Sequence, residues 1–210
     1  MNQPSNNRTP SYFPFKAVLV SALLLVGTGV AVSSFKESNP VLSDSPAKDS
    51  VASVKAFMEV YKVLMSPRCM NCHPKGDRPL QGDSSKIHSM NVKRGKDGKG
   101  LLALKCANCH QPENAEANHA PPGNPKWHLP PADMKMVFEG RSPRELALQL
   151  LDHNKNGHKS KAQLIEHARD TLVKAGWNMG EERKPPPLTY KEFVAAWDTW
   201  INEGAYAPAQ

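Results

Sequence analysis

Residues 69–73 read C-M-N-C-H and residues 106–110 read C-A-N-C-H, and these two segments hold all four cysteines of the 210-residue chain. Both have the form C-x-x-C-H, the pattern that attaches a c-type haem to a protein. The two thiols bond to the vinyl groups of one porphyrin, and the histidine that follows becomes the proximal ligand of the iron. The sequence therefore predicts two covalently bound c-type haems.

The motif assigns a role to each of its residues. The predicted cofactor-binding residues are Cys69, Cys72, His73, Cys106, Cys109 and His110. Of these, His73 and His110 are the predicted proximal iron ligands.

Four cysteines in two pairs also suit a zinc site or a disulfide framework. Zinc ribbons separate their two pairs by roughly 15–20 residues, whereas residues 73–105 lie between these pairs. Histidine fills only 8 of 210 positions, and zinc does not explain why it follows both pairs directly. The pattern favours haem.

The N-terminal segment predicts export. Arg8 and Lys16 precede an apolar run at residues 17–32, and no acidic residue occurs before Glu37. Residues 1–33 therefore suit a signal peptide cleaved after Ser33 or a retained membrane anchor. The run contains no cysteine, which excludes a lipoprotein.

Two segments follow this N-terminal part. Residues 34–50 are rich in serine and proline, which predicts a flexible tether. Residues 51–208 are long enough for one domain with a core. We expect an exported, periplasmic protein that residues 17–32 anchor to the inner membrane if they are retained.

The basic composition does not indicate a nucleic-acid partner. The formal net charge is +7, and about four propionate charges on two haems would offset much of it. One basic cluster lies between the two motifs and consists of Lys93, Arg94, Lys96 and Lys99. It suits either a solvated loop or a docking patch for an acidic redox partner.

Apolar spacing and capping residues predict four helices and no strand. Residues 51–65 form the first, ending before Pro67. The others begin at Ser142, at Ser160 and at Thr189, each followed three positions later by Glu or Gln. We expect the third to end at Gly176 and the last at Gly204, since glycine often follows a helix.

Between these helices, residues 74–140 are rich in Pro, Gly, Asn and Lys. Two macrocycles can replace much of the core that such a segment lacks. We therefore expect a mainly α fold: a single compact dihaem cytochrome c-like domain with long Pro/Gly-rich loops wrapping the haems. Phe193, Trp197 and Trp200 are expected in the core rather than in an electron relay.

The order of these features resembles a c-type cytochrome, and the doubled motif makes it a dihaem one. Residues 69–140 contain GDRPLQGD, MNVKRGKDGKG, KCANCHQPENA and PPGNPKWHLPPADMKMVFEG. These stretches are similar to small bacterial dihaem cytochromes named as accessory subunits of isoquinoline oxidoreductase-type enzymes. Unlike a two-domain dihaem cytochrome, this chain places His73 and His110 too close for two full units, so we expect the haems to share one domain.

Function depends on the distal ligands, because two protein ligands make an electron carrier and an open position permits chemistry. Met134 is the first candidate, since LPPADMKM is similar to the proline-led loop that delivers the axial methionine in cytochromes c. The other distal candidates are His88 and Met90, which we expect near the first haem, and His119 and His167.

We therefore expect a periplasmic or membrane-tethered electron-transfer protein. It would relay single electrons between a periplasmic dehydrogenase or oxidoreductase and a respiratory-chain acceptor. The alternative is a haem enzyme, a peroxidase or a sulfur-compound oxidoreductase, with one open iron. Dihaem peroxidases have longer chains with two haem domains, which disfavours this alternative.

One further motif, D-x-N-x-N-G at residues 152–157, matches the first half of a calcium loop. Position twelve is Gln163 rather than a bidentate Glu. An Asn/Gly turn between two helices explains the same residues, and we expect that turn.

Overall fold

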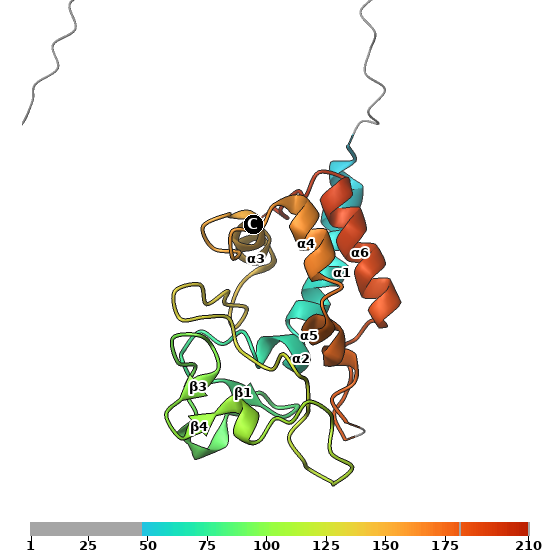
Figure 1. Ribbon diagram of the computed structural model, residues 1–210. Helices are drawn as coiled ribbons and strands as arrows, with labels where there is room; N and C mark the ends of the chain where they lie inside the picture. Colours follow the sequence, from blue (N-terminus) through green and yellow to red (C-terminus); the bar gives the residue numbers. More distant parts are fainter. Residues whose placement is uncertain (1–47, 181, 210) are drawn as a thin grey trace, which may run out of the picture. The chain divides into compact units, whose positions relative to one another are not determined.

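The computed structural model describes residues 48–180 and 182–209 (Figure 1). The predicted signal peptide or anchor and most of the predicted tether lie outside these residues. Helices make up 38% of the described residues and strands 5%, which confirms a mainly α protein. None of the helices in the described ranges is long and apolar enough to span a membrane.

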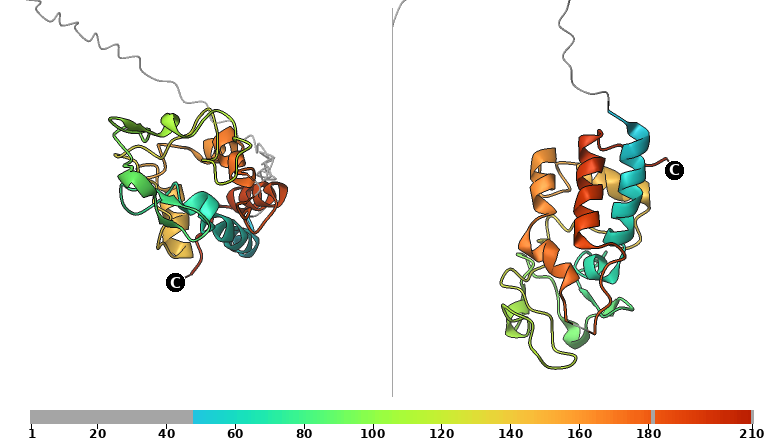
Figure 2. Two further views of the ribbon diagram at one scale, coloured as in Figure 1. Left: turned by 90° about the horizontal axis from the view of Figure 1, so that it is seen from below. Right: turned by 90° about the vertical axis from the view of Figure 1, so that its right-hand side faces the viewer.

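Two antiparallel helices from opposite ends of the domain pack along each other. They are α1, Ser50–Leu64, and α6, Tyr190–Asn202, and the views of Figure 2 agree with this arrangement. Asp49 caps α1 by accepting from the N–H groups of Val51 and Ala52. The predicted first helix is confirmed.

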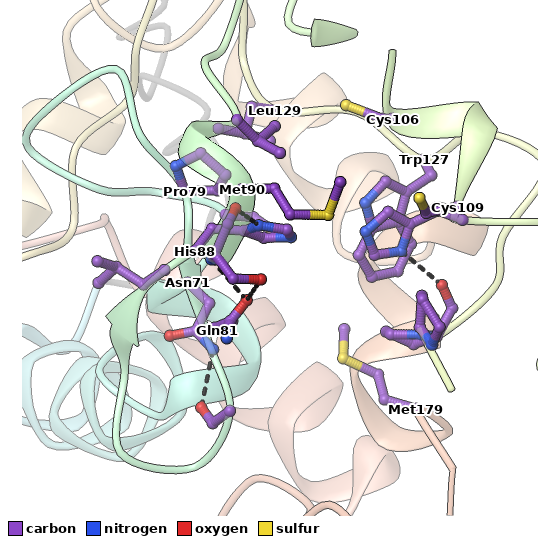
Figure 3. Close-up of a pocket in the computed structure, with 18 of the residues that line it drawn as sticks. Asn71, Pro79, Gln81, His88, Met90, Cys106, Cys109, Trp127, Leu129 and Met179 are labelled. Atoms are coloured by element: carbon purple, nitrogen blue, oxygen red, sulfur yellow. Dashed lines mark hydrogen bonds between the residues drawn. The ribbon is translucent and has the colours of Figure 1, made fainter. Parts of the chain in front are cut away.

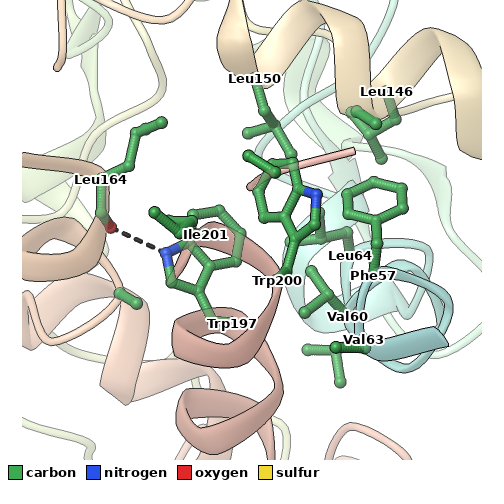
Figure 4. Close-up of a cluster of buried hydrophobic side chains, with 14 of the residues drawn as sticks. Phe57, Val60, Val63, Leu64, Leu146, Leu150, Leu164, Trp197, Trp200 and Ile201 are labelled. Atoms are coloured by element: carbon green, nitrogen blue, oxygen red, sulfur yellow. Dashed lines mark hydrogen bonds between the residues drawn. The ribbon is translucent and has the colours of Figure 1, made fainter. Parts of the chain in front are cut away.

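The core lies between these two helices and two others, α3 (Pro143–Leu151) and α4 (Lys161–His167) (Figure 4). Phe57 of α1 contacts Trp200 of α6 with ring centroids 4.7 Å apart. The indole N–H of Trp197 donates to the carbonyl oxygen of Leu164 at 2.9 Å. Phe193, Trp197 and Trp200 are all buried, which confirms that this aromatic face packs in the core.

Capping boxes begin three of the helices as predicted. In α3, Pro143–Leu151, Ser142 accepts from the Glu145 N–H and the Glu145 side chain accepts from Ser142. The same reciprocal pair begins α4, Lys161–His167, and α6. Such boxes satisfy backbone donors that have no partner within the helix.

The predicted third helix is broken. It ends at His167 instead of continuing to Gly176, and a short helix α5, Thr171–Lys174, follows with the 3₁₀ turn η3, Ala175–Trp177. Asp170 has extended backbone, and its carboxylate accepts from the Leu172 N–H. Aspartate competes with the helix for backbone donors, so it starts a new helix here.

Two short antiparallel hairpins correct the expectation that there would be no strand. Strands β1, Leu80–Gln81, and β2, Lys86–Ile87, pair in the first. Strands β3, Gly100–Leu101, and β4, Leu104–Lys105, pair in the second. Two residues are too few to show an alternating pattern in the sequence.

Buried Arg94 holds the loops of residues 74–140 together. It is 1% exposed, and its guanidinium donates to the carbonyl oxygens of Pro130 at 2.6 Å and Gly76 at 3.1 Å. Its Nε lies 3.5 Å from a carboxylate oxygen of Asp77. Arg94 is therefore a structural residue and not part of an exposed basic cluster.

The turn at residues 152–157 is an Asn/Gly turn, as expected. The buried Asn156 amide donates to the carbonyl oxygens of Leu150 and Lys159, and its Oδ1 accepts from the Lys159 N–H. Asp152 accepts from the Asn154 N–H. These oxygens serve the turn itself.

Candidate functional site

The first motif follows α1 directly. A short helix α2, Pro67–Met70, carries Cys69, and Cys72 and His73 follow in the next turn. His73 Nδ1 lies 2.7 Å from the Met136 carbonyl oxygen. A carbonyl only accepts, so Nδ1 carries the proton and the Nε2 lone pair is left for a ligand bond.

Burial also favours the neutral form of His73. Desolvation lowers its pKa to about 4, although the Met136 carbonyl acts in the opposite direction. Neutral imidazole is the form that binds a metal. The ring lies flat on Phe138, with centroids 3.9 Å apart and planes 7° apart.

The second motif repeats this arrangement. A 3₁₀ turn η2, Cys106–Asn108, carries its first cysteine. His110 Nδ1 lies 2.7 Å from the Pro122 carbonyl oxygen, and its ring stacks on Trp127 with centroids 4.1 Å apart and planes 9° apart. Desolvation lowers the pKa of His110 as well.

The two aromatic partners were not predicted, although a sequence signal existed. Trp127 and Phe138 are the only Phe, Trp or Tyr residues within 74–140, and each one stacks on a motif histidine. In both sites a carbonyl fixes the tautomer and a flat ring fixes the plane. Such outer partners orient a metal ligand and raise its basicity.

All four motif cysteines are free thiols. Burial raises the pKa of Cys69 to about 12 and that of Cys72 to about 11. Within the described ranges, no three His, Cys, Asp or Glu side chains are placed to hold one metal ion. In the described structure the four thiols are therefore not joined in disulfides.

A cavity of about 560 Å³ lies between the two motifs (Figure 3). Its walls include Cys72 of the first motif, and Cys106, Cys109 and His110 of the second. Cys72 and Cys106, from different motifs, thus line one cavity. The two attachment sites therefore adjoin each other.

Cationic side chains border this cavity, and none of the described residues in its lining carries a carboxylate. Arg68 is 4% exposed and donates to Asp83 at 2.5 Å, but its Nε has no hydrogen-bond partner. Arg183 lines the same space. A buried unpaired donor is unfavourable, and an anionic ligand such as a haem propionate would relieve it. The residues fit c-type haem.

The distal candidates fall at different places. His88 and Met90 line the cavity, and the ring centroids of His88 and His110 lie 6.4 Å apart. Because the cavity borders both motifs, the expectation that His88 and Met90 lie near the first haem stays a prediction. Met179, which was not predicted, lines the same cavity.

Histidines 119 and 167 have other surroundings. His119 is exposed, and its Nδ1 lies 2.6 Å from a Glu182 carboxylate oxygen. His167 ends α4, and its charge lowers the pKa of His73, as does the charge of His128. His128 had not been singled out in the sequence.

Met134 lies in the turn after Pro131, whose carbonyl oxygen accepts from the Met134 N–H at 3.0 Å. Among the described residues that wall the cavity, Met134 is not found. The neighbouring Met136 supplies its carbonyl to His73 instead, and its sulfur accepts from the Gln149 side chain at 3.3 Å. Met134 as a distal ligand stays a prediction.

The mainly helical domain and its two histidine sites were compared with known proteins. No protein-family model, curated protein or solved structure matches the chain. The resemblance to accessory dihaem cytochromes therefore stays a prediction.

Proposed function

We propose that this chain is a dihaem c-type cytochrome that carries single electrons between a periplasmic oxidoreductase and the respiratory chain. The observation that carries the proposal is the repeated environment of His73 and His110. Each imidazole has Nδ1 at 2.7 Å from a backbone carbonyl and one face on an aromatic ring.

That repetition supports ligation of two irons. The two carbonyls belong to Met136 and Pro122, in separate loops with different sequences. Two different loops are expected to build the same surroundings if His73 and His110 have the same role. Presenting a neutral Nε2 lone pair to a metal is such a role, because a hydrogen bond to Nδ1 fixes the tautomer and the orientation of the ring.

The free thiols supply the covalent attachment. Cys69 and Cys72 would hold one haem, and Cys106 and Cys109 the other, while His73 and His110 ligate the irons. When bound, each iron supplies one-electron chemistry by changing between the ferric and ferrous states. The chain's own residues fix the imidazoles and exclude water from one face of each ring.

The position of Cys72 and Cys106 supports transfer between the two haems. Both cysteines line one cavity, although they belong to different motifs. Two haems attached there would have neighbouring edges. A pair with two different ligand sets would have two potentials, and the chain would then pass electrons in one direction.

Partners and location belong to the same proposal. We expect an exported protein in the periplasm, with redox partner proteins at both ends of the relay. An accessory role beside an isoquinoline oxidoreductase-type enzyme is the most specific form of the proposal, and it rests on the resemblance of residues 69–140.

The test is carbon monoxide binding to the dithionite-reduced protein, produced in a strain that matures c-type cytochromes, with haem counted on the same sample. We expect two haems per chain and no spectral shift, because both irons are closed by protein ligands. A shift from one haem would contradict the carrier and favour the haem-enzyme alternative. A chain without haem would refute both.

A further inference from the structure

His88 and His110 face each other across the cavity. Their ring centroids are 6.4 Å apart, and the ring planes are 57° apart. Figure 3 shows His88 on one side of the cavity, with Trp127, on which His110 stacks, on the other. Both rings line the space beside the thiols of Cys106 and Cys109.

This separation suits one metal ion between the two rings. A bond from a metal to an imidazole nitrogen is about 2.0–2.1 Å long, so two imidazoles on opposite sides of one metal have centres about 6.3 Å apart. A tilted ring pair in ordinary contact has centroids within about 4.5–7 Å, so the distance alone does not distinguish a metal-bridged pair from an ordinary contact. The hydrogen bonds of the ring nitrogens are the second observation.

Each ring has one nitrogen held by a backbone carbonyl. His88 Nδ1 lies 2.9 Å from the Ser89 carbonyl oxygen, and His110 Nδ1 lies 2.7 Å from that of Pro122. Both rings are therefore in the tautomer that leaves the Nε2 lone pair free. Both Nε2 lone pairs are therefore available to one metal ion between the rings.

The first hairpin holds His88 in place. His88 follows β2 directly, and its backbone N–H donates to the Pro79 carbonyl oxygen at 2.9 Å. The Ser89 N–H donates to Gln81 of β1 at 3.0 Å. Met90 and Asn91 have positive φ of 59° and 54°. Strained backbone of this kind is kept where the geometry serves a site.

We propose that His88 is the second axial ligand of the iron attached at the second motif, opposite His110. The inference rests on the proposed function and names the ligand set of that haem. Two imidazoles close the iron to outside ligands and give a lower potential than a histidine and methionine pair. The second haem is then the lower-potential member unless the first also has two histidines.

The experiment compares His88→Ala with His119→Ala, which removes another histidine from the same cavity wall. Haem is counted on each sample, and carbon monoxide is titrated into the reduced protein. We expect His88→Ala to bind one more equivalent per chain than the wild type, and His119→Ala to bind no more. Added imidazole should compete for the open position and weaken the new binding.

A second variant keeps the test independent of a loss of folding. His88→Met retains a ligand, so we expect one haem to gain a sulfur-to-iron charge-transfer band and a higher potential. Two haems per chain with unchanged carbon monoxide binding in His88→Ala and no new band in His88→Met would overturn the role of His88. A wild-type chain without two haems would instead overturn the proposed function.

Discussion

The imidazole of His110 lies flat on the indole of Trp127, with centroids 4.1 Å apart and planes 9° apart. The loop that carries the indole is tied back to the motif, since the Asn124 N–H donates to the Gln111 carbonyl oxygen at 2.9 Å and Asn124 accepts from the Trp127 N–H. The second motif thus has its own aromatic support, separate from that of the first.

Trp127→Ala should disturb one haem and spare the other. Loss of the stacked ring, worth about 0.5–1.5 kcal/mol beyond the buried area, would let the His110 imidazole turn about the proposed bond to iron. We expect one of two potentials to shift in a redox titration, while Trp127→Phe keeps both. Phe138→Ala should shift the other potential. A shift of both by either variant would contradict the separate supports.

Arg94→Ala should destabilise the loops. The substitution leaves the Pro130 and Gly76 carbonyls without their buried donor, and each such unpaired group costs about 1–3 kcal/mol. We expect a loss of about 2–5 kcal/mol in the free energy of unfolding, measured by denaturant titration. Lys96→Ala, at an exposed site two residues away, is the control. Equal stability of the two variants would show that Arg94 is not structural.

Two leucines of α3 test the core. Leu146 is fully buried and Leu148 is 48% exposed. We expect Leu146→Ala to lower the free energy of unfolding by about 2–5 kcal/mol, and Leu148→Ala to change it by about 0.5 kcal/mol or less. Similar losses at both positions would mean that α3 packs differently.

Acid should weaken the start of α6 through Glu192. Its hydrogen bonds with Thr189 lower its pKa below the ordinary value of 4.5. A carboxylate whose pKa falls on folding stabilises the protein above the unfolded pKa, and this stability is lost as pH falls through the folded pKa.

Thermal melts from pH 7 to below pH 4.5 check this acid sensitivity. Glu192→Gln keeps a capping side chain but does not titrate. We expect the gap in Tm between wild type and variant to shrink as the pH falls below 4.5. A constant gap would show that Glu192 does not contribute through its charge.

Local signals account for what was predicted of the fold. The starts of α3, α4 and α6 depend on pairs three residues apart, such as Thr189 and Glu192, which a sequence displays directly. The break at Asp170 was missed because an aspartate in a helical pattern suits both a helix interior and a cap. The strand pairs, two residues long, have no pattern to detect.

Part of the candidate site could be predicted in the same way. The motif residues are adjacent in the chain, so C-x-x-C-H names them without a structure. Their partners are distant: Met136 lies 63 residues from His73, and only the folded loops bring its carbonyl there. The pairing of His88 with His110 depends on the β1–β2 hairpin, which has no sequence signal of its own.

The central claim is that two haems are covalently attached at the two motifs. Intact-mass measurement under denaturing conditions, on protein from a strain that matures c-type cytochromes, tests it most directly. We expect the mass of the exported chain plus two haems, and plus one haem in a Cys106→Ser/Cys109→Ser variant. The mass of the bare chain, or two haems retained by that variant, would contradict the claim.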